Sequence, residues 1–294
     1  MSTATAVMAA AVVGGARQAR LVRAPLPEPG PGEALVRLEG CGVCASSLPA
    51  WEGRPWFSYP LEPGAPGHEG WGVVEGLGAG AEGLEPGERV ALLSYRAFAE
   101  YDVAPAELCV PLPAELDGAP VPLEPLGCAV NVLRRADLLP GQRVAVVGLG
   151  FLGRLVAALA GRAGADVVEL RRGDSVTGPF ERVVECAGTQ AALDTASALV
   201  AERGRLVIAG YHQDGLRSVD LQSWNWRGID VVNAHERDAA VVVEGMREGA
   251  ALLARGELDL ALLLSHRFPL PRLEEAFEAA RTRPPGFVKA WVEP

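Results

Sequence analysis

The chain has 294 residues, 49% of them hydrophobic, and a formal net charge of −10 at pH 7. That length is enough for two domains with a large apolar core, whereas the negative charge argues against nucleic-acid binding, which needs a basic surface. No apolar run reaches the ~18 residues that a membrane span requires. The apolar segment 6–13 follows no basic stretch, so it predicts a first strand rather than a signal peptide. We therefore expect a cytoplasmic protein without nucleic-acid or membrane partners.

Few side chains of the sequence are suited to covalent chemistry. Five scattered cysteines do not make the framework of a disulfide-rich domain. Lysine occurs once, at Lys289 near the C-terminal end, and the other basic side chains are arginines. Proton transfer is therefore expected to fall to serine, histidine, tyrosine, carboxylates or metal-bound water.

The pattern of elements changes near residue 125. Before it, short β-like runs at 34–38, 72–75 and 89–93 are separated by proline–glycine turns, which indicates an irregular β barrel. After it, apolar strands alternate with helices, which is typical of a parallel sheet. We expect strands at 143–147, 166–170, 182–185, 205–209 and 230–233, helices at 151–163, 191–201 and 239–255, and a helix–strand unit over 273–292. The predicted fold is α/β with two domains: a β-barrel domain over 1–128, a doubly wound parallel sheet over 129–233, and a segment over 234–294 that returns to the first domain.

Four residues of the barrel region have side chains suited to a metal ion, namely Cys44, His68, Glu69 and, further along, Glu124. A thiolate, an imidazole and carboxylates are ligands of Zn²⁺, and a catalytic zinc keeps one position open for water or substrate. A single Cys or His is more often a buried structural residue. Here each stands in a short local motif, and the combination indicates a catalytic zinc site.

A glycine fingerprint follows the apolar strand at 143–147 and opens an apolar helix. It consists of Gly148, Gly150, Phe151, Leu152 and Gly153, in the pattern Gly-x-Gly-x-x-Gly. In this context, backbone N–H groups and a helix N-terminus point toward a pyrophosphate, so the segment predicts dinucleotide binding.

The end of the next strand bears on the choice of nucleotide. The position where NAD enzymes carry an acidic residue for the ribose 2′-hydroxyl is Arg171, followed by Arg172. Guanidinium groups bind phosphate well, so NADP is favoured over NAD. The alternative is that both arginines are merely solvated and that Glu169 or Asp174 contacts an unphosphorylated ribose.

One βα unit of the nucleotide-binding sheet is missing from the sequence. Only a few polar, Gly- and Pro-containing residues separate Arg172 from the next strand. In the strand order 3-2-1-4-5-6 the third strand is an edge, so its loss leaves the centre of the sheet intact. Arg171, Arg172 and Asp174 would then also protect the exposed edge from pairing.

Together these motifs resemble the medium-chain dehydrogenase/reductase family, in its zinc-dependent alcohol and polyol dehydrogenase branch of the sorbitol and threonine dehydrogenase type. The resemblance runs nearly end to end, from 27–33 to 286–289. Its most specific parts are the motifs at 42–44, 67–69 and 124–126 and the fingerprint at 148–153. It implies a GroES-like catalytic barrel and a Rossmann domain.

The resemblance also implies roles for single residues. Cys44 and His68 would ligate zinc, with either Glu69 or Glu124 as the third protein ligand. The hydroxyl of Ser46 would touch the substrate oxygen and start a proton relay. The segment that follows the strand at 205–209 would flank the nicotinamide; it contains Gly210, Tyr211 and His212.

Several features differ from the family's usual pattern. Pro49 and Asn131 stand near places where relay histidines are common, so the proton would leave through water, Glu52, His212 or His235. The four-cysteine lobe that holds a second, structural zinc is missing, because Ser94 to Ala97 lead straight into the next strand. We therefore expect one catalytic zinc and no structural zinc. A homodimer or homotetramer is expected, although that lobe shapes subunit contacts in the family.

The sequence as a whole predicts a zinc-dependent oxidoreductase that transfers hydride between NAD(P) and a secondary alcohol, polyol or sugar-like substrate, or the matching ketone. Two alternatives keep the fold. In one, transient oxidation with a tightly held nucleotide leads to net epimerisation or elimination. In the other, the protein binds nucleotide without catalysis.

Overall fold

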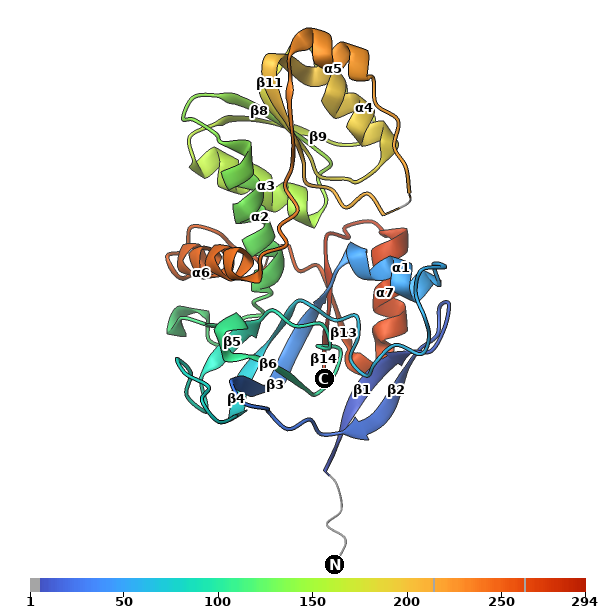
Figure 1. Cartoon of the computed structure of the whole chain (residues 1–294), viewed down its shortest axis with the longest axis vertical. Coiled ribbons are helices and arrows are strands. Elements are labelled where there is room, and N and C mark those ends of the chain that lie inside the picture. Colours follow the sequence, from blue (N-terminus) through green and yellow to red (C-terminus); the bar gives the residue numbers. More distant parts are fainter. Residues whose placement is uncertain (1–5, 214, 262) are drawn as a thin grey trace, which may run out of the picture. The chain divides into compact units, whose positions relative to one another are not determined.

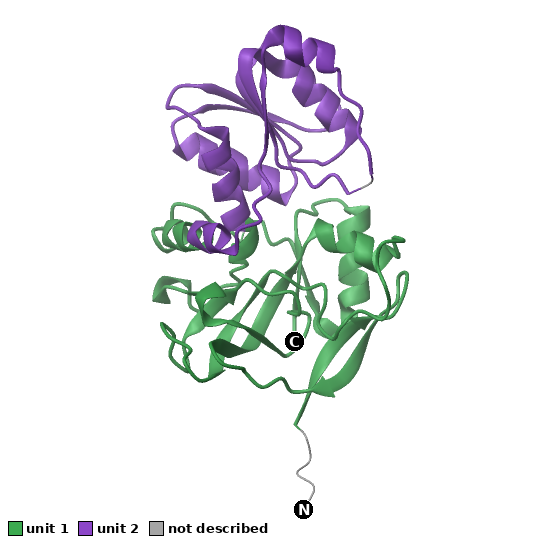
Figure 2. Ribbon diagram, in the orientation of Figure 1, with its two compact units in different colours: residues 1–125, 246–294 green, residues 126–245 purple. Residues whose placement is uncertain are grey.

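The computed structural model of the chain describes residues 6–213, 215–261 and 263–294, which form two compact units (Figures 1 and 2). Unit 1 comprises residues 1–125 and 246–294, and unit 2 comprises residues 126–245. The chain enters unit 2 within helix α2 (Leu123–Ala136) and leaves it within helix α6 (Ala239–Ala254). The boundaries therefore fall inside helices, near the predicted 128/129 and twelve residues after the predicted 233/234. No described helix is both long and apolar enough to cross a membrane.

Unit 1 is built on a seven-stranded sheet with the order β13-β14-β3-β4-β5-β7, in which β6 also pairs with β3. Its strands and helices are β1 (Val7–Val13), β2 (Ala19–Pro25), β3 (Glu33–Val43), α1 (Leu48–Glu52), β4 (Gly70–Leu77), β5 (Arg89–Leu92), β6 (Tyr101–Pro105), β7 (Cys109–Pro111), β13 (His266–Pro269), α7 (Leu273–Thr282) and β14 (Ala290–Glu293). Alternate residues Ala34, Val36 and Leu38 of β3 are buried, as expected for a strand with one face on the core. The ranges 266–269 and 290–293 thus join the sheet of unit 1.

Helix α7 covers this core with one apolar stripe. Leu273, Ala276, Phe277 and Ala280 are buried at the i, i+3, i+4, i+7 spacing of an amphipathic helix. Phe277 stacks on Trp51 of α1 with ring centroids 5.5 Å apart. The stack fixes α1, and with it the short segment that begins at Cys44.

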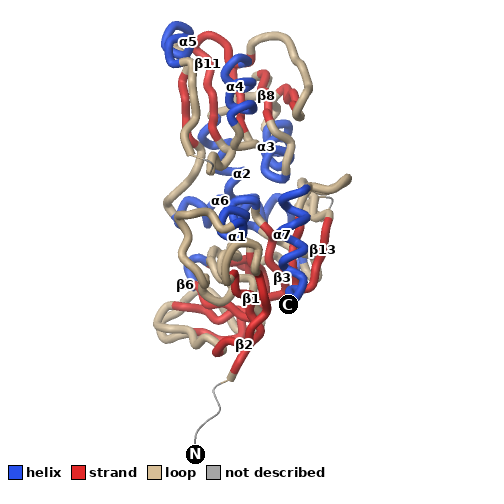
Figure 3. Tube along the Cα trace, turned by 90° about the vertical axis from the view of Figure 1, so that its right-hand side faces the viewer, coloured by secondary structure: helices blue, strands red, loops and turns tan. Residues whose placement is uncertain are grey.

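Unit 2 is a parallel sheet of five strands in the order β12-β11-β10-β8-β9. Its elements after α2 are β8 (Arg143–Val147), α3 (Phe151–Arg162), β9 (Asp166–Leu170), β10 (Phe180–Glu185), α4 (Gln190–Leu199), β11 (Val200–Ile208), α5 (Leu221–Arg227) and β12 (Asp230–Asn233). Helices α3 and α4 lie on opposite faces of the sheet (Figures 1 and 3). Residues 171–179 connect β9 to β10 without a helix or strand, so β9 is the edge of the sheet and the predicted loss of one βα unit is confirmed.

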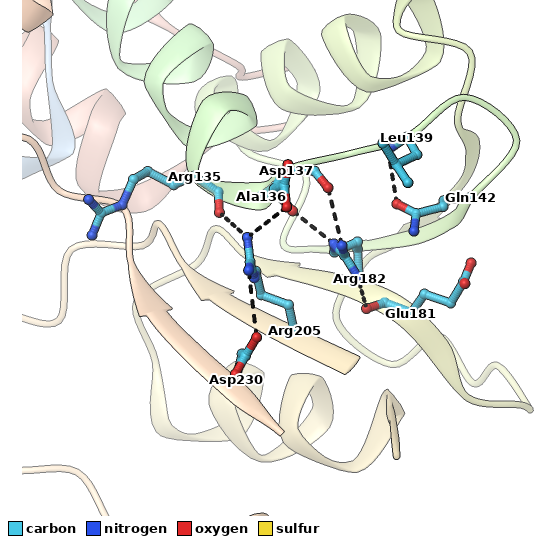
Figure 4. A network of polar contacts seen from close by, with 9 residues as sticks. All are labelled: Arg135, Ala136, Asp137, Leu139, Gln142, Glu181, Arg182, Arg205 and Asp230. Atoms are coloured by element: carbon cyan, nitrogen blue, oxygen red, sulfur yellow. Dashed lines mark hydrogen bonds and ion pairs between the residues drawn. The ribbon is translucent and has the colours of Figure 1, made fainter. Parts of the chain in front are cut away.

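Two arginines tie the end of α2 to the sheet (Figure 4). Arg182 of β10 donates to the carbonyl oxygen of Ala136 at 2.8 Å, and Arg205 of β11 donates to that of Arg135 at 3.3 Å. These are among the last carbonyls of the helix, which have no partner inside it. Arg205 also lies 3.5 Å from Asp230 of β12. The network thus joins α2 to three adjacent strands.

Candidate metal and nucleotide sites

The register between β3 and β4 brings the first three predicted ligands together. The two strands are antiparallel and pair Cys41 with Gly70. Cys44 comes three residues after the first member of that pair, and Glu69 immediately precedes the second. Gly42 donates its N–H to the carbonyl of Glu69 at 3.1 Å, which extends the ladder up to the site. Cys44 itself has left the strand and stands in extended conformation before a 3₁₀ turn.

Within the described part of the chain, Cys44, His68 and Glu69 form one group of metal-ligating side chains. Their ligand atoms all lie within 4.8 Å of one another. Cys44 and His68 are half-buried and Glu69 is buried, at 1% exposure. A sulfur, an imidazole nitrogen and a carboxylate oxygen at this spacing match the donor set of a catalytic zinc with an open position.

His68 is oriented for metal binding by its backbone neighbour. Its Nδ1 lies 2.9 Å from the carbonyl oxygen of Pro66, which can only accept, so Nδ1 carries the proton. In the neutral ring, which a metal ion requires, Nε2 then has the lone pair, the usual arrangement of a metal-ligating histidine. Ser46 Oγ lies 3.3 Å from this Nε2, so the predicted relay hydroxyl is at the site. Tyr95 lies nearly parallel to the imidazole, with ring centroids 6.2 Å apart.

Lys289 belongs to this site, although sequence reasoning set it aside. Its Nζ lies 2.5 Å from Oε1 of Glu69, and both side chains are buried. The second carboxylate oxygen, Oε2, is buried without a hydrogen-bond partner. This oxygen lies so close to Gly42 that a Cβ there would be 1.9 Å away. An ammonium ion thus holds one oxygen of Glu69 and leaves the other for a ligand, which fits a metal ion.

Glu124 stands in the first turn of α2 and is not a member of the close group of three. Its charge nevertheless reaches the site. Burial by itself lowers the pKa of His68, but the hydrogen bond and charge of Cys44, together with the charges of Glu124 and Glu69, outweigh it and raise this pKa to about 10. The concentration of negative charge around the imidazole indicates a place for a cation.

In unit 2, the glycine fingerprint lies between β8 and α3 as predicted. Gly150 caps α3 and Phe151 begins it. Gly148 has a φ of +100°, a conformation that favours glycine. A Cβ on Gly153 would lie 2.0 Å from the carbonyl oxygen of Gly148, so strand and helix approach more closely than another residue would allow. Leu152 lies within the first turn of the helix.

The other predicted nucleotide residues lie at the carboxyl ends of two parallel strands, β9 and β11. Arg171 and Arg172 follow β9 in an exposed turn, in which the carboxylate of Asp174 accepts the N–H of Arg171 at 2.8 Å. Gly210, Tyr211 and His212 follow β11. The Tyr211 ring is 60% exposed and stacks on His235, which follows β12, at 6.4 Å. Ligands of open parallel sheets bind at this carboxyl edge.

Sequence reasoning missed Glu185 at the end of β10. This carboxylate is fully buried and contacts His212, with Glu185 Oε2 3.0 Å from Nε2 of the ring. An acidic residue that follows two valines at the end of the strand, five residues before a helix, was the available signal.

Comparison with known proteins agrees with this architecture. Residues 30–114 match the alcohol dehydrogenase GroES-like domain. Human sorbitol dehydrogenase is 28% identical, over 91% of this chain and 91% of its own. A cobalt- and zinc-bound thermostable alcohol dehydrogenase from Pyrobaculum aerophilum is 26% identical, with a TM-score of 0.82 over 98% of this chain and 99% of its own. A Sinorhizobium meliloti protein bound to NADP has the same fold, with a TM-score of 0.82 at 23% identity over 98% of this chain and all of its own.

A GroES-like barrel with a Cys-His-Glu group suited to a metal ion, followed by a parallel sheet with a glycine fingerprint, is the architecture of a two-domain dehydrogenase. The relatives narrow this class. Along nearly its whole length the chain is similar to zinc-type alcohol and polyol dehydrogenases of the medium-chain dehydrogenase/reductase family.

Proposed function

We propose that the protein is a zinc-dependent oxidoreductase that transfers hydride between NAD(P) and a secondary alcohol or polyol, or the matching ketone. The observation that carries this proposal is the convergence of Cys44, His68 and Glu69 ligand atoms within 4.8 Å, in a chain that also has a dinucleotide fingerprint. The similarity to the alcohol dehydrogenase GroES-like domain and to human sorbitol dehydrogenase supports the same chemistry.

The residues of unit 1 have distinct tasks in this reaction. Zinc, when bound, supplies a Lewis acid that favours loss of the substrate's hydroxyl proton. Cys44 and His68 hold the ion, and the Pro66 carbonyl keeps the imidazole in the ligating tautomer. The Ser46 hydroxyl, next to His68 Nε2, accepts the substrate's proton within a hydrogen-bonded chain and passes it toward solvent.

We propose Glu69 rather than Glu124 as the third protein ligand. Its unpartnered Oε2 and its place in the close group support this choice. Glu124 contributes negative charge to the site. The donor set supports one catalytic zinc per chain.

For the nucleotide, we propose NADP. Arg171 and Arg172 follow β9 and are both exposed, so their guanidinium groups are accessible to a 2′-phosphate. Replacing both with alanine should raise the KM for NADP at least tenfold and leave that for NAD within a factor of two. Alanine at Arg162, an exposed arginine of α3, is the matched control. An equal effect on both nucleotides would contradict the choice of NADP.

A second copy of the chain is the proposed protein partner. Large apolar side chains are exposed in unit 2 on the segment from the end of β11 to β12, the edge strand of the sheet. They are Tyr211, Leu216, Val219, Leu221, Trp226 and Val231, with Trp226 88% exposed. Such a set beside an open strand edge supports a homodimer or homotetramer. The cytoplasmic location stays a prediction.

Metal analysis paired with turnover tests the function. The wild-type protein and Cys109→Ser, a buried cysteine outside the site, should each contain about one zinc ion and oxidise secondary alcohols or polyols. Cys44→Ser should lose both zinc and turnover. Ser46→Ala should lower kcat about 100-fold with zinc retained, whereas the adjacent Ser47→Ala, whose hydroxyl bonds the Pro66 carbonyl, should not.

Two results would redirect the proposal. Undiminished turnover in a zinc-free Cys44→Ser protein would exclude the zinc mechanism. A copurifying nucleotide with substrate turnover but no net change in nicotinamide absorbance would indicate epimerisation or elimination instead.

A further inference from the structure

Glu185 organises the carboxyl end of the parallel sheet from inside. Its Oε1 accepts the N–H groups of Ala187 at 2.7 Å and Gly188 at 2.8 Å, and its Oε2 lies 3.0 Å from Nε2 of His212. The side chain is fully buried. Because burying a carboxylate is costly unless it is hydrogen-bonded, these three donors account for its presence in the fold.

The two ring nitrogens of His212 have opposite roles in this arrangement. An ionised carboxylate can only accept, so Nε2 carries the proton and donates to Glu185. Nδ1 then has a lone pair, and Arg217 Nε donates to it at 3.0 Å. The same guanidinium donates through Nη2 to the carbonyl oxygen of Gly188 at 3.1 Å. The neutral imidazole of His212 therefore connects Glu185 to Arg217, and both of its ring nitrogens are hydrogen-bonded.

The segments joined by this chain are in direct contact. A Cβ on Gly210 would lie 2.2 Å from the N atom of Gly188, and one on Gly188 would lie 2.5 Å from the carbonyl oxygen of Tyr211. Gly188 has a φ of +69°, which favours glycine. Segment 186–188, after β10, and segment 210–212, after β11, thus form one surface with no space for a larger residue between them.

We propose that His212 is a positioning residue of the nucleotide site. Through Glu185 and Arg217 it fixes segments 186–188 and 210–212, against which a dinucleotide at the carboxyl edge of the sheet would lie. The inference rests on the proposed function for the identity of the ligand. It gives His212 no part in proton exit, because both ring nitrogens are already engaged. That role then falls to water or to other groups.

Nucleotide binding, measured directly, tests the role of His212. Titration of NADPH and NADH fluorescence gives the dissociation constant without turnover. His212→Phe fills the space but leaves Glu185 Oε2 without its donor, and its dissociation constant should rise at least tenfold. His212→Gln can both donate to Glu185 and accept from Arg217, so it should stay within threefold of wild type. At saturating nucleotide, kcat of both variants should change less than threefold.

Two further variants complete the experiment. Arg217→Met removes the donor to Nδ1 of His212 and to the carbonyl oxygen of Gly188, but leaves the bond between His212 and Glu185. It should weaken nucleotide binding about threefold, and it tests the same arrangement if His212→Phe does not fold. His266→Phe, an imidazole of unit 1 bonded to Ser265, should leave binding unchanged.

The possible results separate this inference from the function on which it rests. Wild-type affinity in both His212→Phe and Arg217→Met would overturn the positioning role alone. A fall in kcat at unchanged affinity, with no rescue by glutamine, would instead make His212 a proton relay. A wild-type protein that binds neither nucleotide would overturn the proposed function and the inference together.

Discussion

Removal of the Lys289 side-chain charge should destabilise unit 1 strongly. In Lys289→Met the carboxylate of Glu69, which is 1% exposed, loses the ammonium ion 2.5 Å from Oε1, while its Oε2 already lacks a partner. Breaking a buried ion pair by removing one partner costs about 3–5 kcal/mol. We therefore expect the free energy of unfolding of the zinc-free variant to fall by about that amount. Bound zinc would compensate part of the unpaired charge of Glu69, so the loss should be smaller in zinc-loaded protein.

Urea unfolding with and without a chelator measures both values. Glu69→Gln in the Lys289→Met background should restore much of the lost stability, because it removes the buried charge. The double-mutant cycle then gives the coupling free energy between the two substitutions. Arg267→Met is the matched control. It breaks the exposed ion pair with Glu293, for which a loss of no more than about 1 kcal/mol is expected.

The reasoning would be refuted by a loss below about 1 kcal/mol in zinc-free Lys289→Met, or by additive effects of the two substitutions. Either result would mean that Lys289 and Glu69 do not depend on each other in the native state.

Three other substitutions test separate parts of the molecule. Burial raises the pKa of Asp102 above its ordinary 3.8, so this carboxyl group binds its proton more tightly in the folded than in the unfolded protein. Its contribution to stability therefore falls as the pH rises above 3.8. Asp102→Asn should unfold at higher urea than wild type at pH 7, and the difference should be smallest in acid. Arg182→Met leaves two carbonyl oxygens at the end of α2 without their donor and should lower the stability of unit 2 by about 1–3 kcal/mol in thermal unfolding. Gly42→Ala should displace the Glu69 carboxylate and weaken zinc binding at least tenfold in a competition titration with a chelating dye.

Much of the fold could be predicted because its signals are local. The apolar run of β8 is short and bounded by glycines, and the fingerprint at 148–153 stands directly between a strand and a helix. The absence of one βα unit could also be predicted, because the segment of chain between β9 and β10 is too short to contain a helix and a strand. Helix α5 was not predicted; it has no buried residue and therefore no apolar stripe to reveal it.

The candidate site could be predicted only where its residues carry their own motif. Cys44, His68 and Glu69 did, but Lys289 reaches Glu69 because β14 pairs with β3, aligning Ala290 with Val43. Such a pairing between the two ends of the chain depends on the assembled sheet and cannot be inferred from spacing. The role of Arg217 could not be predicted for a similar reason. It donates to His212, whose other partner, Glu185, lies on a different strand.

The solitary, buried lysine makes the amine chemistry of the protein unusually simple. Apart from the α-amino group, the one target of an amine-reactive reagent is Lys289, which is only 5% exposed. Its labelling rate therefore reports how often the Glu69 environment opens. Peptide mass analysis over time would follow that opening at a single position, with no substitution and no attached probe.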